Sequence, residues 1–176
     1  MNATSTPSPS LAALSALPQA DFVARLADIF EHSPWIPERA WPGRPFASID
    51  ALHTAMLAVL EAASDAEKLG LICAHPELAG KEASAGTLTV ASTGEQRGAG
   101  LDQCSADELQ RLRRLNAAYR ERFGFPFVIA VKGLSRYQIM DAVEARLAND
   151  RDTEFAACLT QIGRIARFRL DALLGA

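Results

Sequence analysis

Apolar residues recur at the spacing of an α-helix through most of the chain, and short polar motifs mark where individual helices begin. Ser105-Ala-Asp-Glu108 has the form of a capping box, in which serine and glutamate side chains accept hydrogen bonds from backbone N–H groups at a helix start. An apolar-periodic run follows to Phe123, and Gly124 with Pro126 then interrupts the pattern. The sequence therefore predicts a helix from just after Ser105 to about Phe123.

The same start signal occurs twice more along the chain. Ser64-Asp-Ala-Glu67 and Ser135-Arg-Tyr-Gln138 each precede a shorter apolar run. Helical periodicity, or an alanine- and leucine-rich composition without a breaker, predicts further helices over residues 19–31, 51–63 and 154–174. Helices therefore account for most of the predicted regular structure.

Only two segments favour β structure, residues 87–90 and 127–131. Both are too short and isolated to build a sheet, so we predict an all-α fold. We expect residues 10–176 to form a single compact multi-helix domain. Residues 1–9 are rich in Ser, Thr and Pro and are expected to form a flexible tail, because they cannot bury enough apolar surface to become ordered.

Composition and charge narrow the classes of protein that remain. The chain has 49% hydrophobic residues, a net charge of −3 and no basic run, which argues against a nucleic-acid-binding protein. It has no apolar window long enough for a membrane span and no recognisable secretory or peroxisomal signal. Its three cysteines are widely separated and suggest neither a disulfide framework nor a metal knuckle. We therefore expect a soluble cytoplasmic protein without membrane association.

The segment 79–100 collects polar and glycine residues between two helical regions. It contains five glycines together with Ser92, Thr93, Glu95 and Gln96. We interpret it as a long loop, and such loops in compact domains are usually functional or disordered. A nucleotide site is disfavoured because the glycines do not follow the spacing of a phosphate-binding loop.

Arg169 stands out on the last predicted helix. At about 100° per residue it falls on the same stripe as a set of apolar residues. That set is Phe155, Leu159, Ile162, Ala166 and Leu173. A guanidinium directed towards a core must meet an anion or reach water. The anion can be a structural Asp or Glu or a bound carboxylate, or the side chain can extend to the surface, and the pattern alone leaves these alternatives open.

His75 follows an apolar helix end and directly precedes Pro76 in the segment LICAHPELAGK. Sterics before proline favour an extended backbone at His75, which allows its ring to leave the helix and face a pocket. The residue alone fits a structural cap or a catalytic group. Metal ligation is disfavoured because His32, His53 and His75 show no ligand spacing.

Several linked motifs together resemble those of the 2-oxo-4-hydroxy-4-carboxy-5-ureidoimidazoline (OHCU) decarboxylases. The resemblance extends from about residue 11 to the end of the chain. The matching segments are Phe30-Glu-His-Ser-Pro-Trp-Ile36, Arg44-Pro-Phe46, His75-Pro-Glu-Leu-Ala-Gly-Lys81, Ser92-Thr-Gly-Glu-Gln96, Ala99-Gly-Leu101, Leu115-Asn-Ala-Ala-Tyr119, Phe123-Gly-Phe-Pro-Phe-Val-Ile129 and Arg169-Leu170.

This resemblance implies the decarboxylation of OHCU to (S)-allantoin, the last of three steps from urate, without a cofactor or metal. It also implies an all-helical fold, a homodimer and a possible coupling to the 5-hydroxyisourate hydrolase of the preceding step. By motif position His75 is expected to be the catalytic acid/base, Glu95 to act beside it and Arg169 to hold the substrate anion. The remaining residues expected to line the substrate site are Pro76, Ser92, Thr93, Gly94, Gln96, Phe127, Val128, Ile129, Ala130 and Val131.

Two other functions are compatible with parts of the sequence: a helical adaptor domain and a metal-dependent hydrolase. A helical adaptor domain would explain the periodicity and the acidic charge, but it leaves the polar segment and Arg169 without a role. A metal-dependent hydrolase of another ureide predicts an activity that chelators abolish. A histidine with a pKa near its ordinary value of about 6.5 can instead move protons at neutral pH without a metal.

Overall fold

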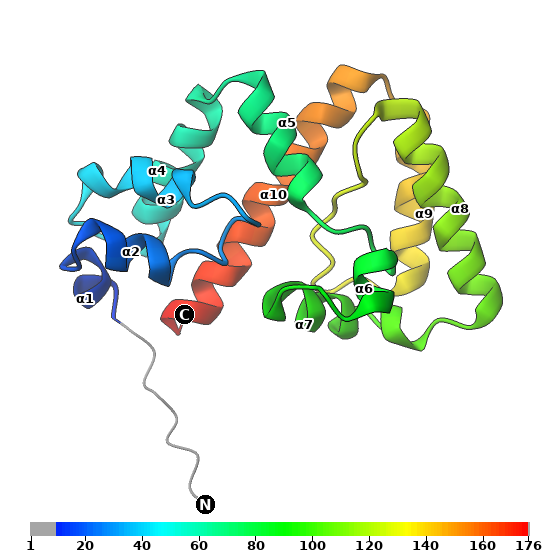
Figure 1. Ribbon diagram of the computed structural model, residues 1–176, viewed down its shortest axis with the longest axis horizontal. Helices are drawn as coiled ribbons and strands as arrows, with labels where there is room; N and C mark the ends of the chain where they lie inside the picture. Colours follow the sequence, from blue (N-terminus) through cyan, green and yellow to red (C-terminus); the bar gives the residue numbers. More distant parts are fainter. Residues whose placement is uncertain (1–9, 176) are drawn as a thin grey trace, which may run out of the picture. The chain divides into compact units, whose positions relative to one another are not determined.

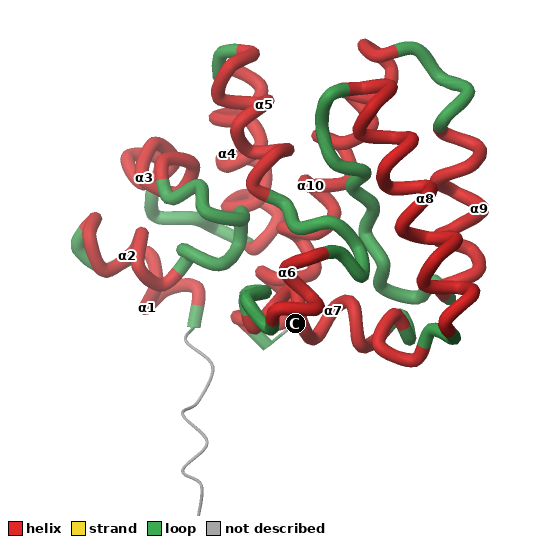
Figure 2. Tube along the Cα trace, turned by 45° about the vertical axis from the view of Figure 1, so that its right-hand side comes forward, coloured by secondary structure: helices red, strands yellow, loops and turns green. Residues whose placement is uncertain are grey.

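Helices follow one another along the chain, and no strand occurs within residues 10–175, which are the residues that this computed structural model describes. The prediction of an all-α fold is therefore confirmed (Figure 2). The expected flexible tail, residues 1–9, lies outside the described residues. The elements are α1 (Leu11–Ser15), α2 (Gln19–Arg25), α3 (Trp35–Ala40), η1 (Trp41–Gly43), α4 (Ile49–Ala62), α5 (Asp65–Ala74), α6 (Lys81–Ala85), α7 (Val90–Gly98), η2 (Leu101–Gln103), α8 (Ala106–Phe123), α9 (Arg136–Arg146) and α10 (Arg151–Leu174).

The predicted capping boxes are confirmed at three helix starts. The hydroxyls of Ser64, Ser105 and Ser135 each accept from a backbone N–H three residues later, and the Glu or Gln at that position accepts from the serine N–H. Gly124 ends α8 in the left-handed region, at φ 80°. These helix ends are therefore set by local sequence.

Two predicted elements were wrong. The helix predicted over residues 19–31 is shorter than expected, because α2 ends at Arg25. Residues 26–31 form turns, although Leu26, Ile29 and Phe30 are still buried. The segment 79–100 is largely helical, because it contains α6 and α7. The Thr89 hydroxyl accepts from the Ser92 N–H and starts α7. Gly80, Gly86 and Gly100 lie at helix ends, and Gly94 and Gly98 lie within α7 at a cost of only about 1 kcal/mol each, so the glycines did not mark a continuous loop.

Contacts between residues divide the chain into two compact units. Unit 1 consists of residues up to Ala63 together with those from Ile165 onwards, and unit 2 is Ser64–Arg164. Helix α10 contributes residues to both units. In unit 1, α3 packs against α2 and α4, and the rings of Phe22 and Phe46 are stacked 6.2 Å apart. The extent of the domain predicted over residues 10–176 stays a prediction.

Unit 2 has an aromatic core between its longest helices. Helices α8 and α9 lie side by side, as Figure 1 shows. Tyr119 on α8 contacts Phe123 and Phe127, with ring centroids 4.6 and 5.2 Å apart. Residues 126–131 have no regular secondary structure and pass through this core with Phe125, and of the side chains from 125 to 131 only that of Ile129 is not buried. Burying a Phe stabilises a fold by about 1.5–3 kcal/mol, so the core holds this segment firmly.

The buried face of α10 differs from the predicted stripe. Ile162, Ala166 and Arg169 are buried as expected, whereas Phe155 and Leu159 are only half-buried. Glu154, which is fully buried, was not predicted to face the core. An apolar pattern cannot identify such a residue, because its burial depends on polar partners elsewhere in the chain.

Candidate functional site

His75 ends helix α5 with an extended backbone, at φ −74° and ψ 131°. This is the geometry that the following Pro76 predicted. The side chain is buried, and its Nδ1 lies 3.0 Å from the carbonyl oxygen of Leu71. Because a carbonyl can only accept, Nδ1 must carry the hydrogen, and Nε2 is the basic nitrogen of the neutral ring.

The loop that follows His75 is fixed from two helices. The backbone N–H of Ala79 donates to the side-chain oxygen of Gln96 on α7, at 2.9 Å. The side-chain NH₂ of Asn116 on α8 donates to the carbonyl of Leu78, also at 2.9 Å. Both Gln96 and Asn116 are buried, so these bonds are shielded from water and hold the loop in one conformation.

The same loop contains a tight turn at residues 77–80. Ala79 has a φ of 50°, which costs a residue with a Cβ roughly 1–2 kcal/mol. A Cβ built at Gly80 would lie 2.7 Å from the Cβ of Glu77, so the close approach of the chain requires glycine there. The bonds from α7 and α8 offset this strain.

Helix α7 carries the predicted residues of the polar segment. Ser92 and Gln96 lie four residues apart on its buried face, and Thr93 and Glu95 are half-buried. Gly94 lies within the helix, where its N–H is used by the helix itself. A Cβ added at Gly94 would meet no atom within 4 Å, so the space beside it is open. The Gly94 N–H is therefore not available to a ligand, but close approach of a ligand to this glycine is compatible with the fold, and its place in the substrate site stays a prediction.

Side chains from α9 and α10 anchor the segment Phe127–Val131. The Arg146 guanidinium donates to the Val128 carbonyl at 2.8 Å. The Ala130 N–H donates to the side-chain oxygen of Gln161 at 3.0 Å. Phe127, Val128, Ala130 and Val131 are buried, whereas Ile129 is half-buried. The backbone of this segment is therefore fixed on both sides of Ile129.

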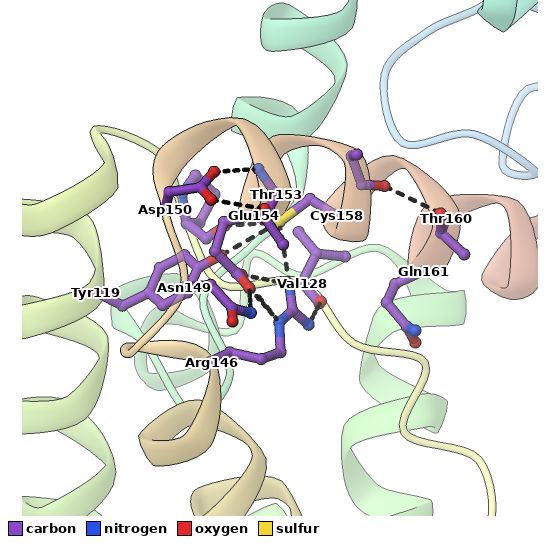
Figure 3. A network of polar contacts seen from close by, with 12 residues as sticks. Tyr119, Val128, Arg146, Asn149, Asp150, Thr153, Glu154, Cys158, Thr160 and Gln161 are labelled. Atoms are coloured by element: carbon purple, nitrogen blue, oxygen red, sulfur yellow. Dashed lines mark hydrogen bonds and ion pairs between the residues drawn. The ribbon is translucent and has the colours of Figure 1, made fainter.

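Arg146 belongs to a polar network that sequence reasoning missed, drawn in Figure 3. Its Nη2 and Nε lie 2.8 and 2.9 Å from Glu154 Oε2, and Asn149 donates to the other carboxylate oxygen at 2.7 Å. The Tyr119 hydroxyl also donates to Glu154. Burial alone would raise the pKa of Glu154, but these hydrogen bonds hold it below its usual value. Glu154 is therefore a buried carboxylate that stays ionised.

Arg169, in unit 1, is buried and ion-paired. Its Nη1 donates to Glu31 Oε2 at 2.7 Å and to the carbonyl of Asp28 at 2.8 Å. Glu31 itself is 2% exposed. This arrangement corresponds to the structural ion pair that was one of the alternatives for Arg169. The expected contact with a substrate anion stays a prediction.

Unit 2 thus gathers most of the predicted site residues, from His75 and Pro76 through α7 to Phe127–Val131. Helix α8 supports two of these segments, through Asn116 on the loop after His75 and through Tyr119 against Phe127. Within residues 10–175, no group of three or more His, Cys, Asp or Glu side chains is placed to hold a metal ion. Among the described helices, none combines the length and apolar character of a membrane span.

Known proteins resemble this chain over most of its length. A 2-oxo-4-hydroxy-4-carboxy-5-ureidoimidazoline decarboxylase of Haloferax volcanii is 44% identical over 149 residues, which cover 85% of this chain and 86% of that protein. A uric acid degradation bifunctional protein of Bacillus sp. (strain TB-90) is 40% identical over 91% of this chain, which spans only 31% of that longer protein. A crystal structure of (S)-allantoin synthase superposes with a TM-score of 0.73 at 28% identity, covering 94% of this chain and 54% of the other.

A family model agrees with these relatives. The model described as OHCU decarboxylase matches residues 15–171, which include every predicted site residue from His75 to Arg169. With this match and the similarity to the Haloferax volcanii protein along most of both chains, the chain belongs to the OHCU decarboxylase family.

Proposed function

We propose that this chain decarboxylates OHCU to (S)-allantoin, the last step from urate in purine breakdown. Family membership supports the reaction class. The observation that carries the proposal is the ring of His75, which is buried and oriented by the Leu71 carbonyl so that Nε2 is basic. A base fixed in this way suits a reaction whose only protein-assisted chemistry is the movement of protons.

The substrate itself can accept the electrons that decarboxylation releases. The bond between the ring carbon and its carboxylate breaks, CO₂ leaves, and the electron pair is delocalised into the adjacent ring C=N. The ring nitrogen that receives the electron pair takes up a proton, which gives an enol-like species. This species then loses its hydroxyl proton to become a carbonyl, while the neighbouring ring carbon gains a proton. No external electron sink is needed, so the residues of this chain need only bind, orient and transfer protons.

His75 and Glu95 are assigned to these proton transfers. Nε2 of His75 takes the hydroxyl proton, since Nδ1 is already bonded to Leu71. The half-buried Glu95 works beside the imidazole, as the family motif implies. Delivery of the new proton to one face of the ring gives a single enantiomer, because the fixed segments on either side admit the substrate in one orientation.

The residues expected to line the substrate site fall into two groups: those that contact the OHCU ring and those that keep neighbouring segments in position. Pro76, Ser92, Thr93 and the backbone of Phe127–Val131 are assigned to contact. The oxygen of Gln96 already accepts from Ala79, which leaves its NH₂ group to donate to a substrate oxygen. A role of Arg169 in holding the substrate carboxylate rests on the family motif and is tested separately below.

The expected partners are proposals as well. We assign a homodimer, a cytoplasmic location and a functional coupling to the 5-hydroxyisourate hydrolase that supplies the labile substrate. The bifunctional relative supports the coupling, because this chain matches only 31% of it and the rest has room for a second activity.

Turnover of freshly generated OHCU tests the proposal. The decay of the substrate absorbance should accelerate in proportion to protein concentration, and the acceleration should survive exhaustive chelation. A rate equal to spontaneous decay would favour a helical adaptor domain instead. Loss of the activity with chelators, restored by a divalent metal, would favour a metal-dependent hydrolase.

A further inference from the structure

Two side chains outside the predicted site hold the segment Phe127–Val131 by its backbone. Arg146 on α9 donates to the Val128 carbonyl at 2.8 Å, and Gln161 on α10 accepts from the Ala130 N–H at 3.0 Å. The backbone N–H of Val128 also donates to the sulfur of Cys158 on α10. Val128 and Ala130 therefore direct backbone groups towards α9 and α10.

The planar peptide bond then fixes where the groups of Ile129 point. Both peptide bonds of Ile129 are trans, so the C=O and N–H of each point in opposite directions. The Ile129 N–H is opposite the Val128 carbonyl that Arg146 binds. The Ile129 C=O is opposite the Ala130 N–H that Gln161 binds. Both polar groups of Ile129 therefore face away from the anchors, and Ile129 is the residue of this segment that is not buried.

Arg146 is itself held rigidly. Glu154, which is 0% exposed, binds its Nε and Nη2, while Asn149 and the Tyr119 hydroxyl bind the same carboxylate. Figure 3 shows the Arg146 guanidinium between the Glu154 carboxylate and the Val128 carbonyl. The planar fork of an arginine can satisfy both at once, whereas a lysine ammonium cannot span them in the same way.

We propose that Arg146 and Gln161 are positioning residues, which hold the peptide groups on either side of Ile129 so that its N–H and C=O face the substrate. This inference rests on the proposed function, in which residues 127–131 line the substrate site. An N–H donor beside a C=O acceptor matches the donor and acceptor pair of a urea or ureido group, which OHCU contains. The two anchors act through the backbone and do not touch the substrate.

Substitutions can loosen each anchor while the ion pair is kept. Arg146→Lys retains a cation for Glu154 but loses the bond to Val128. Gln161→Ala removes the acceptor for Ala130 and leaves the network around Glu154 intact, whereas Gln161→Glu keeps an acceptor oxygen at the same reach. Arg111→Lys is the matched control, since Arg111 forms an exposed ion pair between α8 and α9 with Asp141 and Glu144.

Two readouts on the full chain test the proposal. Hydrogen exchange followed by mass spectrometry should show faster exchange in the peptide covering residues 125–131 for Arg146→Lys and Gln161→Ala, with α8 unchanged. In steady-state decarboxylation the same variants should raise KM roughly tenfold with kcat within about twofold, because the oriented bonds act on binding. Gln161→Glu should have a KM close to that of wild type. Arg111→Lys should match wild type in both measurements.

Each other outcome counts against a specific claim. Unchanged exchange at residues 125–131 would overturn the anchoring, and faster exchange with a normal KM would overturn the positioning role. A parallel fall in kcat and melting temperature without a change in KM would mark Arg146 and Gln161 as stabilising residues only. A wild-type protein without turnover would overturn the proposed function, and the exchange data would still decide whether these side chains hold the segment.

Discussion

At the scale of single residues, the two charged or titratable side chains singled out from the sequence have different surroundings. His75 has its backbone set by Pro76 and its tautomer set by the Leu71 carbonyl. Arg169 is satisfied by Glu31 and by the Asp28 carbonyl. The first arrangement leaves a basic nitrogen, whereas the second neutralises a charge, so the two residues call for different tests.

His75→Asn should abolish most of the turnover while the helical circular dichroism signal and the melting temperature stay close to wild type. General acid/base groups contribute about 10²–10⁴-fold to a rate, and asparagine can keep a hydrogen bond to the Leu71 carbonyl without offering a base. Rates of OHCU consumption at saturating substrate provide the measurement. A folded His75→Asn variant with near-normal kcat would return His75 to a purely structural role.

Arg169→Met should lower the free energy of unfolding by about 3–5 kcal/mol, because it leaves the buried Glu31 without its guanidinium. Arg167→Met is the control on the same helix, since Arg167 forms part-exposed ion pairs with Asp50 and Asp171 and its loss should change stability far less. Urea denaturation of both variants gives the comparison. Equal small losses would mean that the pair with Glu31 contributes little.

The substrate role of Arg169 needs a separate measurement. Arg169→Lys keeps the charge but loses the planar fork, so a carboxylate held at two points should bind more weakly and KM should rise. A normal KM in this variant would assign Arg169 to the ion pair alone.

At the scale of elements, a short helix carries most of the predicted polar residues of the site. Helix α7 carries Ser92, Thr93, Glu95 and Gln96, and its start depends on the Thr89 hydroxyl, which accepts from the Ser92 N–H at 3.2 Å. A helix of this length is not stable by itself, so its cap and its buried face must hold it. The Thr89 hydroxyl is therefore one of the interactions that keep α7, and with it the site, in place.

Thr89→Ala should cost about 0.5–2 kcal/mol of stability and reduce kcat/KM beyond what this loss alone would cause, because α7 frays where it carries Ser92 and Thr93. Ser135→Ala is the matched control, since it removes the cap of α9 at a similar energetic cost. The measurement is kcat/KM at a temperature where both variants are fully folded. Equal kcat/KM for the two variants would show that the cap of α7 does not influence the site.

At the scale of the whole molecule, local signals predicted helices well and long-range polar contacts poorly. The capping boxes at Ser64, Ser105 and Ser135 were readable because each lies within one helical turn. The network around Glu154 was not, since its partner Tyr119 lies 35 residues away in sequence. The burial of Arg169 was predicted from the apolar stripe of the last helix. Its partner Glu31 could not be predicted, because the two residues are 138 positions apart in sequence and no local pattern links them.

The buried Glu154 should make stability depend on acid pH. Its pKa is lower in the folded protein than the ordinary value of 4.5, owing to bonds from Arg146, Tyr119 and Asn149 that outweigh the effect of burial. A carboxyl with a lowered folded pKa contributes stability that is present above its unfolded pKa and is lost as the pH falls through the folded pKa. Urea midpoints should therefore fall as the pH drops below about 4.5.

Glu154→Gln should be less stable at neutral pH and should show a shallower loss of stability over that acid window, because the titrating group is gone. Glu121→Gln, which removes an exposed carboxylate of α8, controls for the change in net charge. Identical pH slopes in wild type and Glu154→Gln would show that other carboxyl groups govern the acid dependence.

The handedness of the allantoin formed shows whether this chain catalyses the decarboxylation. OHCU generated enzymatically from urate decays spontaneously to allantoin protonated on either face, so the uncatalysed reaction gives no lasting circular dichroism signal. With this chain present, we expect a circular dichroism signal of the sign of (S)-allantoin that grows with the amount of wild-type protein and is nearly absent with His75→Asn. A racemic product in the presence of folded wild-type protein would contradict the proposed decarboxylase function.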